Sequence, residues 1–149
     1  MSDAIIRARA ADTAVPTFDV TPFVTPPPLY EASVAIVTTA ALRLPGEQLL
    51  RGGDHSFRVV GSDDQPALGH GSPNFDRTGW LLDPNVVFPV DRLRELAADG
   101  LIGSVAPRHL SFAGNQQDET LTSIKLDSGP AAAALLAADG VDVVVLTPV

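Results

Sequence analysis

The segment Gly140-Val141-Asp142-Val143-Val144-Val145-Leu146-Thr147-Pro148-Val149 decides the fold class of this chain. Its run of valines with one leucine carries no charge, which predicts a buried strand of a parallel sheet. In open α/β sheets, ligands and catalytic groups gather just beyond the carboxyl ends of such strands. A loop and a covering helix would normally follow. We therefore expect the chain to be the N-terminal part of a larger protein, interrupted beside its reactive site.

A unit of helix, glycine and strand occurs twice in the second half of the chain. The sequence predicts helices over Asp91–Asp99 and Pro130–Asp139, and both are followed by a glycine that stops them. Further strands are predicted at Ser33–Thr39, at His55–Val60 and within Ser104–Phe112. This order predicts a three-layer α/β sandwich with a mostly parallel sheet and crossover helices, incomplete at the C-terminus.

The first 32 residues differ from the rest in their proline content. Pro16, Pro22 and the run Pro26-Pro27-Pro28 favour extended polyproline geometry and exclude helix across that stretch. We therefore predict a Pro-rich extended lead-in over residues 1–32 and an α/β domain over residues 33–149.

Composition excludes several classes of partner and site. Ten Lys and Arg against 18 Asp and Glu give a net charge of −8, which argues against a nucleic-acid or anionic-membrane surface. The chain has no cysteine, so it contains neither a disulfide nor a thiolate metal site. No apolar run approaches the roughly 20 residues of a membrane helix, and the N-terminus lacks a signal peptide. These features predict a cytoplasmic protein.

Three histidines are the candidates for acid–base chemistry. His55, His70 and His109 lie near predicted strand or loop ends, beside glycine or proline and close to an arginine or aspartate. Histidine titrates near neutral pH, and loop ends commonly carry general acids. The structural alternative is that each caps a turn or binds a backbone carbonyl. We expect at least one of the three to serve the active site.

Other familiar motifs are missing from the sequence. No close-spaced pair such as H-x-H or H-E-x-x-H is present, so a metal site is not predicted. A G-x-S-x-G elbow and a G-x-G-x-x-G dinucleotide fingerprint are also missing. The pair Asp76-Arg77 is most simply a local ion pair.

Several segments together resemble one family. The most specific are residues 72–79 (SPNFDRTG), 85–96 (NVVFPVDRLREL) and 100–106 (GLIGSVA). Residues 37–40 and 53–60 upstream fit as well, as do residues 109–114 and 138–149 downstream. Over about residues 33–149 the chain resembles the glycine/sarcosine/betaine/D-proline reductase selenoprotein B family.

The resemblance implies a nucleophile that lies outside this chain. In that family a strand ending in Pro-Val is followed by selenocysteine, or cysteine in some members, within a (Sec or Cys)-Pro-x-Cys pattern. Selenocysteine or cysteine is thus expected immediately after Val149. Because UGA encodes selenocysteine and is ordinarily read as a stop, a misread UGA would explain this end. A selenolate would be ionised at neutral pH and stabilised at a helix N-terminus.

The resemblance also implies an oxidoreductase that reductively cleaves a C–N bond of an amino acid or related amine. Its partners would be a pyruvoyl-containing subunit and a thiol or thioredoxin-type reductant. His55, His70 and His109 are then candidates for protonating the leaving amine or orienting the substrate. Asn74, Asp76 and Arg77 are candidates for shaping the site or binding a substrate carboxylate. The chain by itself is expected to be inactive, with no cofactor of its own.

Two other functions remain open from the sequence. The first is a non-catalytic α/β binding or scaffolding module whose exposed sheet edge pairs in a homo-oligomer. The second, a metal-dependent hydrolase that uses the histidines, has less support in the sequence.

Overall fold

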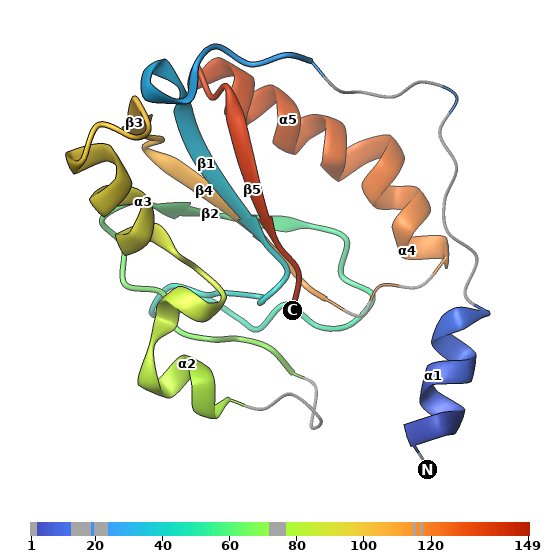
Figure 1. Ribbon diagram of the computed structural model, residues 1–149. Coiled ribbons are helices and arrows are strands. Elements are labelled where there is room, and N and C mark those ends of the chain that lie inside the picture. Colours follow the sequence, from blue (N-terminus) through green and yellow to red (C-terminus); the bar gives the residue numbers. More distant parts are fainter. Residues whose placement is uncertain (1–2, 13–18, 20–23, 72–76, 115, 117) are drawn as a thin grey trace.

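The computed structural model of the protein describes residues 3–12, 19, 24–71, 77–114, 116 and 118–149. Helices and strands alternate along most of this length (Figure 1). In chain order the elements are α1 (Asp3–Ala11), η1 (Leu29–Glu31), β1 (Ser33–Thr38), β2 (Phe57–Gly61), α2 (Thr78–Leu82), η2 (Pro84–Val86), α3 (Val90–Ala98), β3 (Ser104–Val105), β4 (Arg108–Phe112), α4 (Asp118–Ser123), η3 (Ile124–Ser128), α5 (Gly129–Ala138) and β5 (Val143–Thr147).

Strand β1 is the centre of a five-stranded sheet. It pairs in parallel with the whole of β5 through Val34–Thr38, and in parallel with β3 and β4. Strand β2 pairs antiparallel with β4. Because β1, β3, β4 and β5 point the same way, their carboxyl ends meet at one edge of the sheet. The mostly parallel sheet predicted from the sequence is confirmed.

Strands β3 and β4 are two pieces of one interrupted strand beside β1. Ser33 is in register with Ser104, a separation of 71 residues, whereas Val37 is in register with Leu110, a separation of 73. The two extra residues form a bulge around Pro107, which has no amide hydrogen to donate to a ladder. The sequence predicted a continuous extended segment here, and the bulge divides it.

Helices cover both faces of the sheet, as the three layers of Figure 1 show. On one face, Leu93 of α3 packs with Val34 and Ile36 of β1. On the other face, Leu136 of α5 packs with Ala35 of β1, together with Leu110 and Phe112 of β4. The alternation of valine and isoleucine with alanine along β1 thus sends its side chains into two cores.

The lead-in is not extended throughout, in contrast to the expectation from its prolines. Helix α1 occupies Asp3–Ala11, which holds several alanines and arginines and precedes the first proline, Pro16. A short 3-10 turn, η1, follows Pro28. Helix α1 thus lies entirely before the first proline, and residues 13–18 and 20–23 lie outside the described residues. The division into a lead-in and an α/β domain stays a prediction.

The helix before β5 begins earlier than the sequence predicted. Helix α4 continues through a π-helical turn, η3, into α5, so Ser128 lies inside the helix and makes no side-chain cap bond. A Cβ on Gly129 would lie 2.5 Å from the Ile124 carbonyl oxygen, so glycine allows this wide turn. The turn lets Pro130 follow without ending the helix. Among the described residues, every helix is too short or too polar to cross a lipid bilayer.

Candidate functional site

The carboxyl edge of the sheet brings together the residues that follow β1, β4 and β5. The Val149 amide donates to Thr39 Oγ1 at 2.8 Å, and the Thr39 amide donates to the Thr147 carbonyl at 3.2 Å. Thr147 Oγ1 in turn donates to the Val87 carbonyl at 2.9 Å. These bonds fix the backbone after β5 to the end of β1. The main chain at Val149 is therefore held in place at the edge where α/β sheets bind ligands.

Gly114 marks the point at which three segments converge. A Cβ placed on it would lie 3.0 Å from the Val149 oxygen, 3.2 Å from the Thr39 oxygen and 3.4 Å from His70 Nε2. The His70 imidazole and the Val149 carbonyl oxygen thus both border the space that a side chain at position 114 would occupy. Any larger residue at position 114 would push these groups apart.

His70 is nearly buried at this edge, with 9% of its surface exposed. Burial lowers the pKa of His70, and the positive charge of Arg77 lowers it further. Arg77 Nη2 donates to the His70 carbonyl oxygen at 2.9 Å. Of the predicted site residues, His70 and Arg77 are therefore brought into contact. Asn74 and Asp76 lie outside the described residues.

His55 has a different environment. Its side chain is 46% exposed, and its Nε2 lies 3.9 Å from a carboxylate oxygen of Asp127. Gln116 ties the preceding residue to the end of β4, because its amide nitrogen donates to the carbonyl oxygens of Asp54 and Ala113, each at 2.9 Å. His55 is therefore accessible to solvent and lies beside an exposed surface carboxylate.

His109 is fully buried at the bulge between β3 and β4. Its Nδ1 accepts the Ile36 amide hydrogen at 3.0 Å, which replaces the backbone acceptor that the bulge removes. Its Nε2 lies 3.1 Å from Ser62 Oγ, and that hydroxyl donates to the Ala106 carbonyl. An Nδ1 acceptor and an Nε2 donor define a neutral imidazole. Burial, with Arg94 nearby, lowers the pKa of His109 to about 4.

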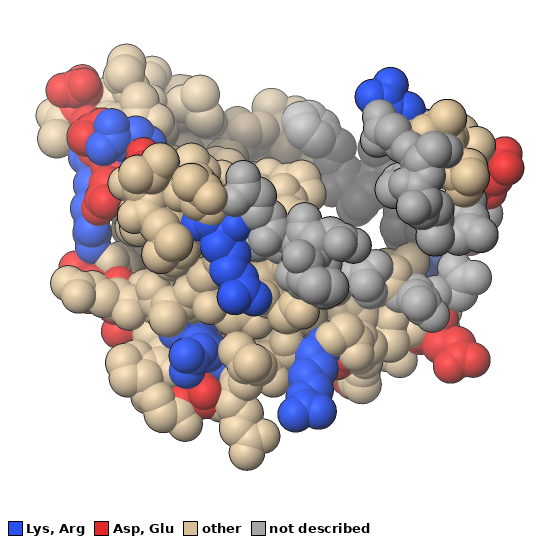
Figure 2. Space-filling view, turned by 90° about the horizontal axis from the view of Figure 1, so that it is seen from below, with Lys and Arg blue, Asp and Glu red and all other residues tan. Residues whose placement is uncertain are grey.

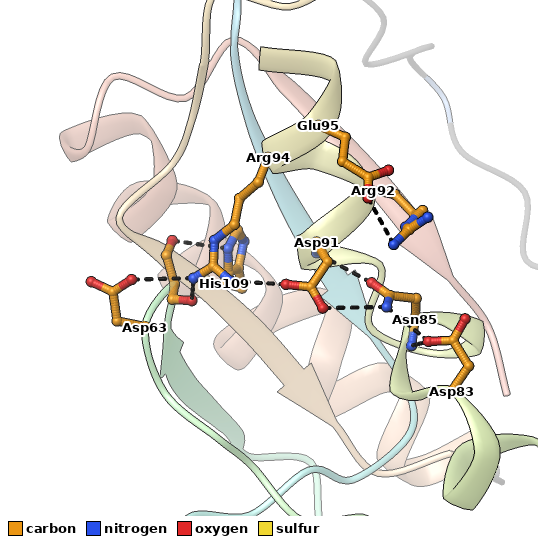
Figure 3. A network of polar contacts seen from close by, with 9 residues as sticks. Asp63, Asp83, Asn85, Asp91, Arg92, Arg94, Glu95 and His109 are labelled. Atoms are coloured by element: carbon orange, nitrogen blue, oxygen red, sulfur yellow. Dashed lines mark hydrogen bonds and ion pairs between the residues drawn. The ribbon is translucent and has the colours of Figure 1, made fainter. Parts of the chain in front are cut away.

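A network of charged side chains lies beside His109 (Figure 3). Arg94 of α3 donates to Asp91 at 2.9 Å and to Asp63 at 3.1 Å, and Asn85 joins Asp91 to Asp83. A polar pocket of about 340 Å³ adjoins it, with Trp80 and Phe88 among its walls. Because the carboxylates are exposed and already paired, the network serves mainly to fasten α3 and η2 to the loop after β2.

An apolar groove of about 760 Å³ runs from the site along the face of the sheet beneath α5. Thr39, Gly114 and Val149 are among the residues that line it. Its walls are Val37, Leu110, Phe112, Ala113, Gln116, Leu121, Ile124, Gly129, Ala132, Ala133, Leu136, Ala137, Val141 and Val144. None of these lining residues is ionisable. A separate observation concerns the surface charges. In the view from below (Figure 2), the Lys and Arg side chains form no single continuous patch on the described surface.

Sequence reasoning did not select Thr39, Gly114 or Val149 as site residues. What could have identified them is their place in the sheet, because each lies after the carboxyl end of a parallel strand that the sequence did predict. Among the described residues, no group of three or more His, Cys, Asp or Glu side chains is arranged to hold a metal ion.

Comparison with known proteins adds independent information. The family described as glycine/sarcosine/betaine reductase selenoprotein B (GRDB) matches residues 63–149. The D-proline reductase subunit gamma of Acetoanaerobium sticklandii is 31% identical to this chain over an alignment 160 residues long, which covers 99% of this chain and 62% of that protein. The chain thus spans less than two thirds of the length of this curated relative. No solved structure matches the chain.

Proposed function

Because this chain belongs to the glycine/sarcosine/betaine reductase selenoprotein B family, we propose that it forms the site of a reductase subunit that cleaves a C–N bond. The substrate would be an amino acid or a related amine. The nucleophile would be a selenocysteine or cysteine that directly follows Val149, and the chain without it would be inactive.

The observation that carries this proposal is that His70 Nε2 and the Val149 carbonyl oxygen both border Gly114, at the carboxyl edge of the sheet. The next residue after Val149 would start from a backbone that Thr39 holds at the carboxyl edge. It would also start beside a nearly buried imidazole. A reactive residue in that position fits the general location of sites in α/β sheets.

His70 is the residue of this chain that we assign to proton transfer. Because its pKa is lowered, its imidazole is neutral at pH 7 and can take the proton of a thiol or selenol nearby. The same proton can then pass to the leaving amine. His109 is less suited to this role, because Ile36 and Ser62 occupy both of its ring nitrogens.

Arg77 is the residue that we assign to a substrate carboxylate. Arg77 is an exposed residue, and one nitrogen of its guanidinium bonds the His70 carbonyl, so it adjoins the proposed acid–base group. Asn74 and Asp76 precede it by one to three positions and stay candidates for the same role. His55 stays a candidate for orienting the substrate.

The selenolate or thiolate would form a bond to carbon while the C–N bond breaks and the amine leaves with a proton. A thiol of the reductant would then attack the selenium or sulfur, so that the carbon leaves and takes a proton to form a C–H bond, and a mixed selenosulfide or disulfide remains. A second thiol of the reductant would displace the nucleophile from it, which makes two electrons in all. Two features of the chain fit such a group at that position. The neighbouring imidazole of His70 is neutral. The adjoining groove is lined by no ionisable residue that could exchange a proton with the nucleophile in place of His70. A pyruvoyl-containing subunit is the further partner that we propose, since the related D-proline reductase protein is itself a subunit.

Reading the gene beyond codon 149 tests the first part of the proposal. An in-frame UGA followed by Pro-x-Cys and further α/β sequence would support it. A different stop codon, or a UGA followed by no coding potential, would overturn the proposed position of the nucleophile.

The second part is tested on the extended protein with cysteine placed after Val149. The rate of alkylation of that thiol by iodoacetamide should rise at a pH well below the usual thiol pKa of about 8.5. His70→Gln should lower the rate at pH 7 several-fold, and Arg92→Gln, an exposed change on α3, should leave it unchanged. Equal rates in native protein and His70→Gln would refute the assignment of His70.

A binding or scaffolding module that forms homo-oligomers is the second candidate, and strand β5 favours it. This strand pairs only with β1 among the described strands, and Leu146 on it is 71% exposed. An uncharged edge strand of this kind readily pairs with another chain. Light scattering on the 149-residue protein, with Leu146→Lys as the test variant, would show a dimer that the lysine dissociates. A native monomer would exclude this candidate.

A further inference from the structure

Ala41, in the turn after β1, has an unusual backbone conformation. Its φ is +51°, and within the described part of the chain it is the one residue other than glycine with a positive φ. The side chain is 2% exposed. Residues with a Cβ rarely adopt the left-handed region, and such conformations cluster at functional sites.

The neighbours of Ala41 hold this conformation from the side of β4. The Ala41 amide donates to the Phe112 carbonyl at 2.9 Å, and the Leu42 amide donates to Ser111 Oγ at 2.8 Å. Ala40 pairs with Ala113 in an antiparallel bridge. The turn is therefore fastened on both sides of the strained residue.

The conformation of Ala41 determines where the segment that leads to His70 can lie. Arg43 and Ala67 exchange two backbone hydrogen bonds, at 2.9 and 2.8 Å, which lays residues 67–69 against the turn. The Ala41 carbonyl then points at Gly69, where an added Cβ would overlap its oxygen. Only glycine at position 69 allows this approach. The next residue is His70.

We propose that Ala41 and Gly69 form a positioning contact that places the His70 imidazole over Gly114, beside the Val149 carbonyl. This inference deepens the proposed function and rests on its assignment of His70, but the contact can be tested without a nucleophile. Neither residue touches a reacting group. Both act through His70, whose backbone carbonyl is held on its other side by Arg77.

The test uses the two glycines that flank His70. Gly69→Ala must move the segment away from Ala41. Among the described residues a Cβ on Gly71 meets nothing within 4 Å, so Gly71→Ala is the matched control. The ring signals of His70 are followed by NMR titration of the isotopically labelled 149-residue protein. Arg77 is the charged group to consider in the titration, and it is unchanged in both variants.

Gly69→Ala is expected to shift the His70 ring signals and the Gly114 amide, and to raise the pKa of His70 toward its ordinary value as the ring becomes hydrated. Gly71→Ala should leave them as in the native protein. Adding Ala41→Gly to Gly69→Ala should restore part of the native shifts, because glycine lets the turn relax. Equal effects of the two glycine variants on His70 would overturn the proposal.

If the Gly69→Ala protein does not fold, the proposal is tested on the native protein instead. The proposal requires a nuclear Overhauser effect between the His70 ring and the Gly114 α-protons, and its absence would overturn the positioning contact. These outcomes are independent of the gene sequence beyond codon 149 and of thiol reactivity. Failure of the contact is thus distinguishable from failure of the proposed function.

Discussion

Acidification from pH 7 to pH 5 should destabilise the protein through His109. Its pKa is lowered from 6.5 to about 4 in the folded chain, so the unfolded chain binds the proton more readily. The stabilisation is complete above pH 6.5 and is lost as the pH falls toward 4. Linkage gives a loss of about 2 kcal/mol between pH 7 and pH 5, and about 3 kcal/mol once both states are protonated.

Urea unfolding followed by the fluorescence of Trp80 measures this loss. His109→Asn keeps a side-chain acceptor for the Ile36 amide and removes the titration. The free energy of unfolding of His109→Asn should therefore decrease less than that of the native protein between pH 7 and pH 5. The difference between the two decreases should be about 2 kcal/mol. His70 contributes in the same direction to both proteins, so the difference isolates His109.

The exposed and non-titrating variant Leu82→Ala is the control and should show the native pH dependence. The reasoning would be refuted if native protein and His109→Asn lost the same stability over this range. That result would mean that the folded chain takes up a proton at His109 as readily as the unfolded chain, so the Nδ1 acceptor bond with the Ile36 amide does not oppose protonation.

Three further predictions concern stability. Gly103→Ala should cost about 2 kcal/mol or more in urea unfolding, because its Cβ would overlap the backbone of Glu31, whereas Gly52→Ala has open space and should be neutral. Leu136→Ala should lower the free energy of unfolding by about 2–5 kcal/mol, against less than about 0.5 for the 82% exposed Leu82→Ala. Arg94→Gln should cost up to about 1 kcal/mol in low salt and less in 1 M NaCl, because its ion pairs are exposed.

The elements that periodicity could predict are those with strong local signals. Ser33–Thr38 is uncharged and β-branched, and Val90–Ala98 has an apolar face and a terminal glycine, so both were predicted within a residue or two of their bounds. The polar stretch before α5 has no such signal. Its helix depends on the π-helical turn at Ile124–Ser128, which Gly129 permits through a contact between neighbouring turns.

The candidate site was harder to predict, because its parts meet only through the tertiary structure. Proximity to glycine or proline gave the three histidines the same weight, although one of them replaces a backbone acceptor inside the sheet. The backbone acceptor is missing because of the bulge between β3 and β4. That bulge can be recognised only from the pairing of both strands with β1, some 70 residues away in the sequence. His70 and Val149 likewise approach one another through Gly114, which carries no chemical group that a motif search would select.

The central position of β1 also has a consequence for the order of folding. Thr38 and Thr147 are hydrogen-bonded partners 109 residues apart, so the innermost strand is among the first to be synthesised and among the last to be enclosed. Such long-range pairing gives a high contact order and slow folding. During synthesis the apolar segment Ser33–Thr38 stays unpaired on the β5 side, where it is open to association with other nascent chains. The cell would have to protect this strand, with a chaperone or by fast translation, until residues 143–147 reach it.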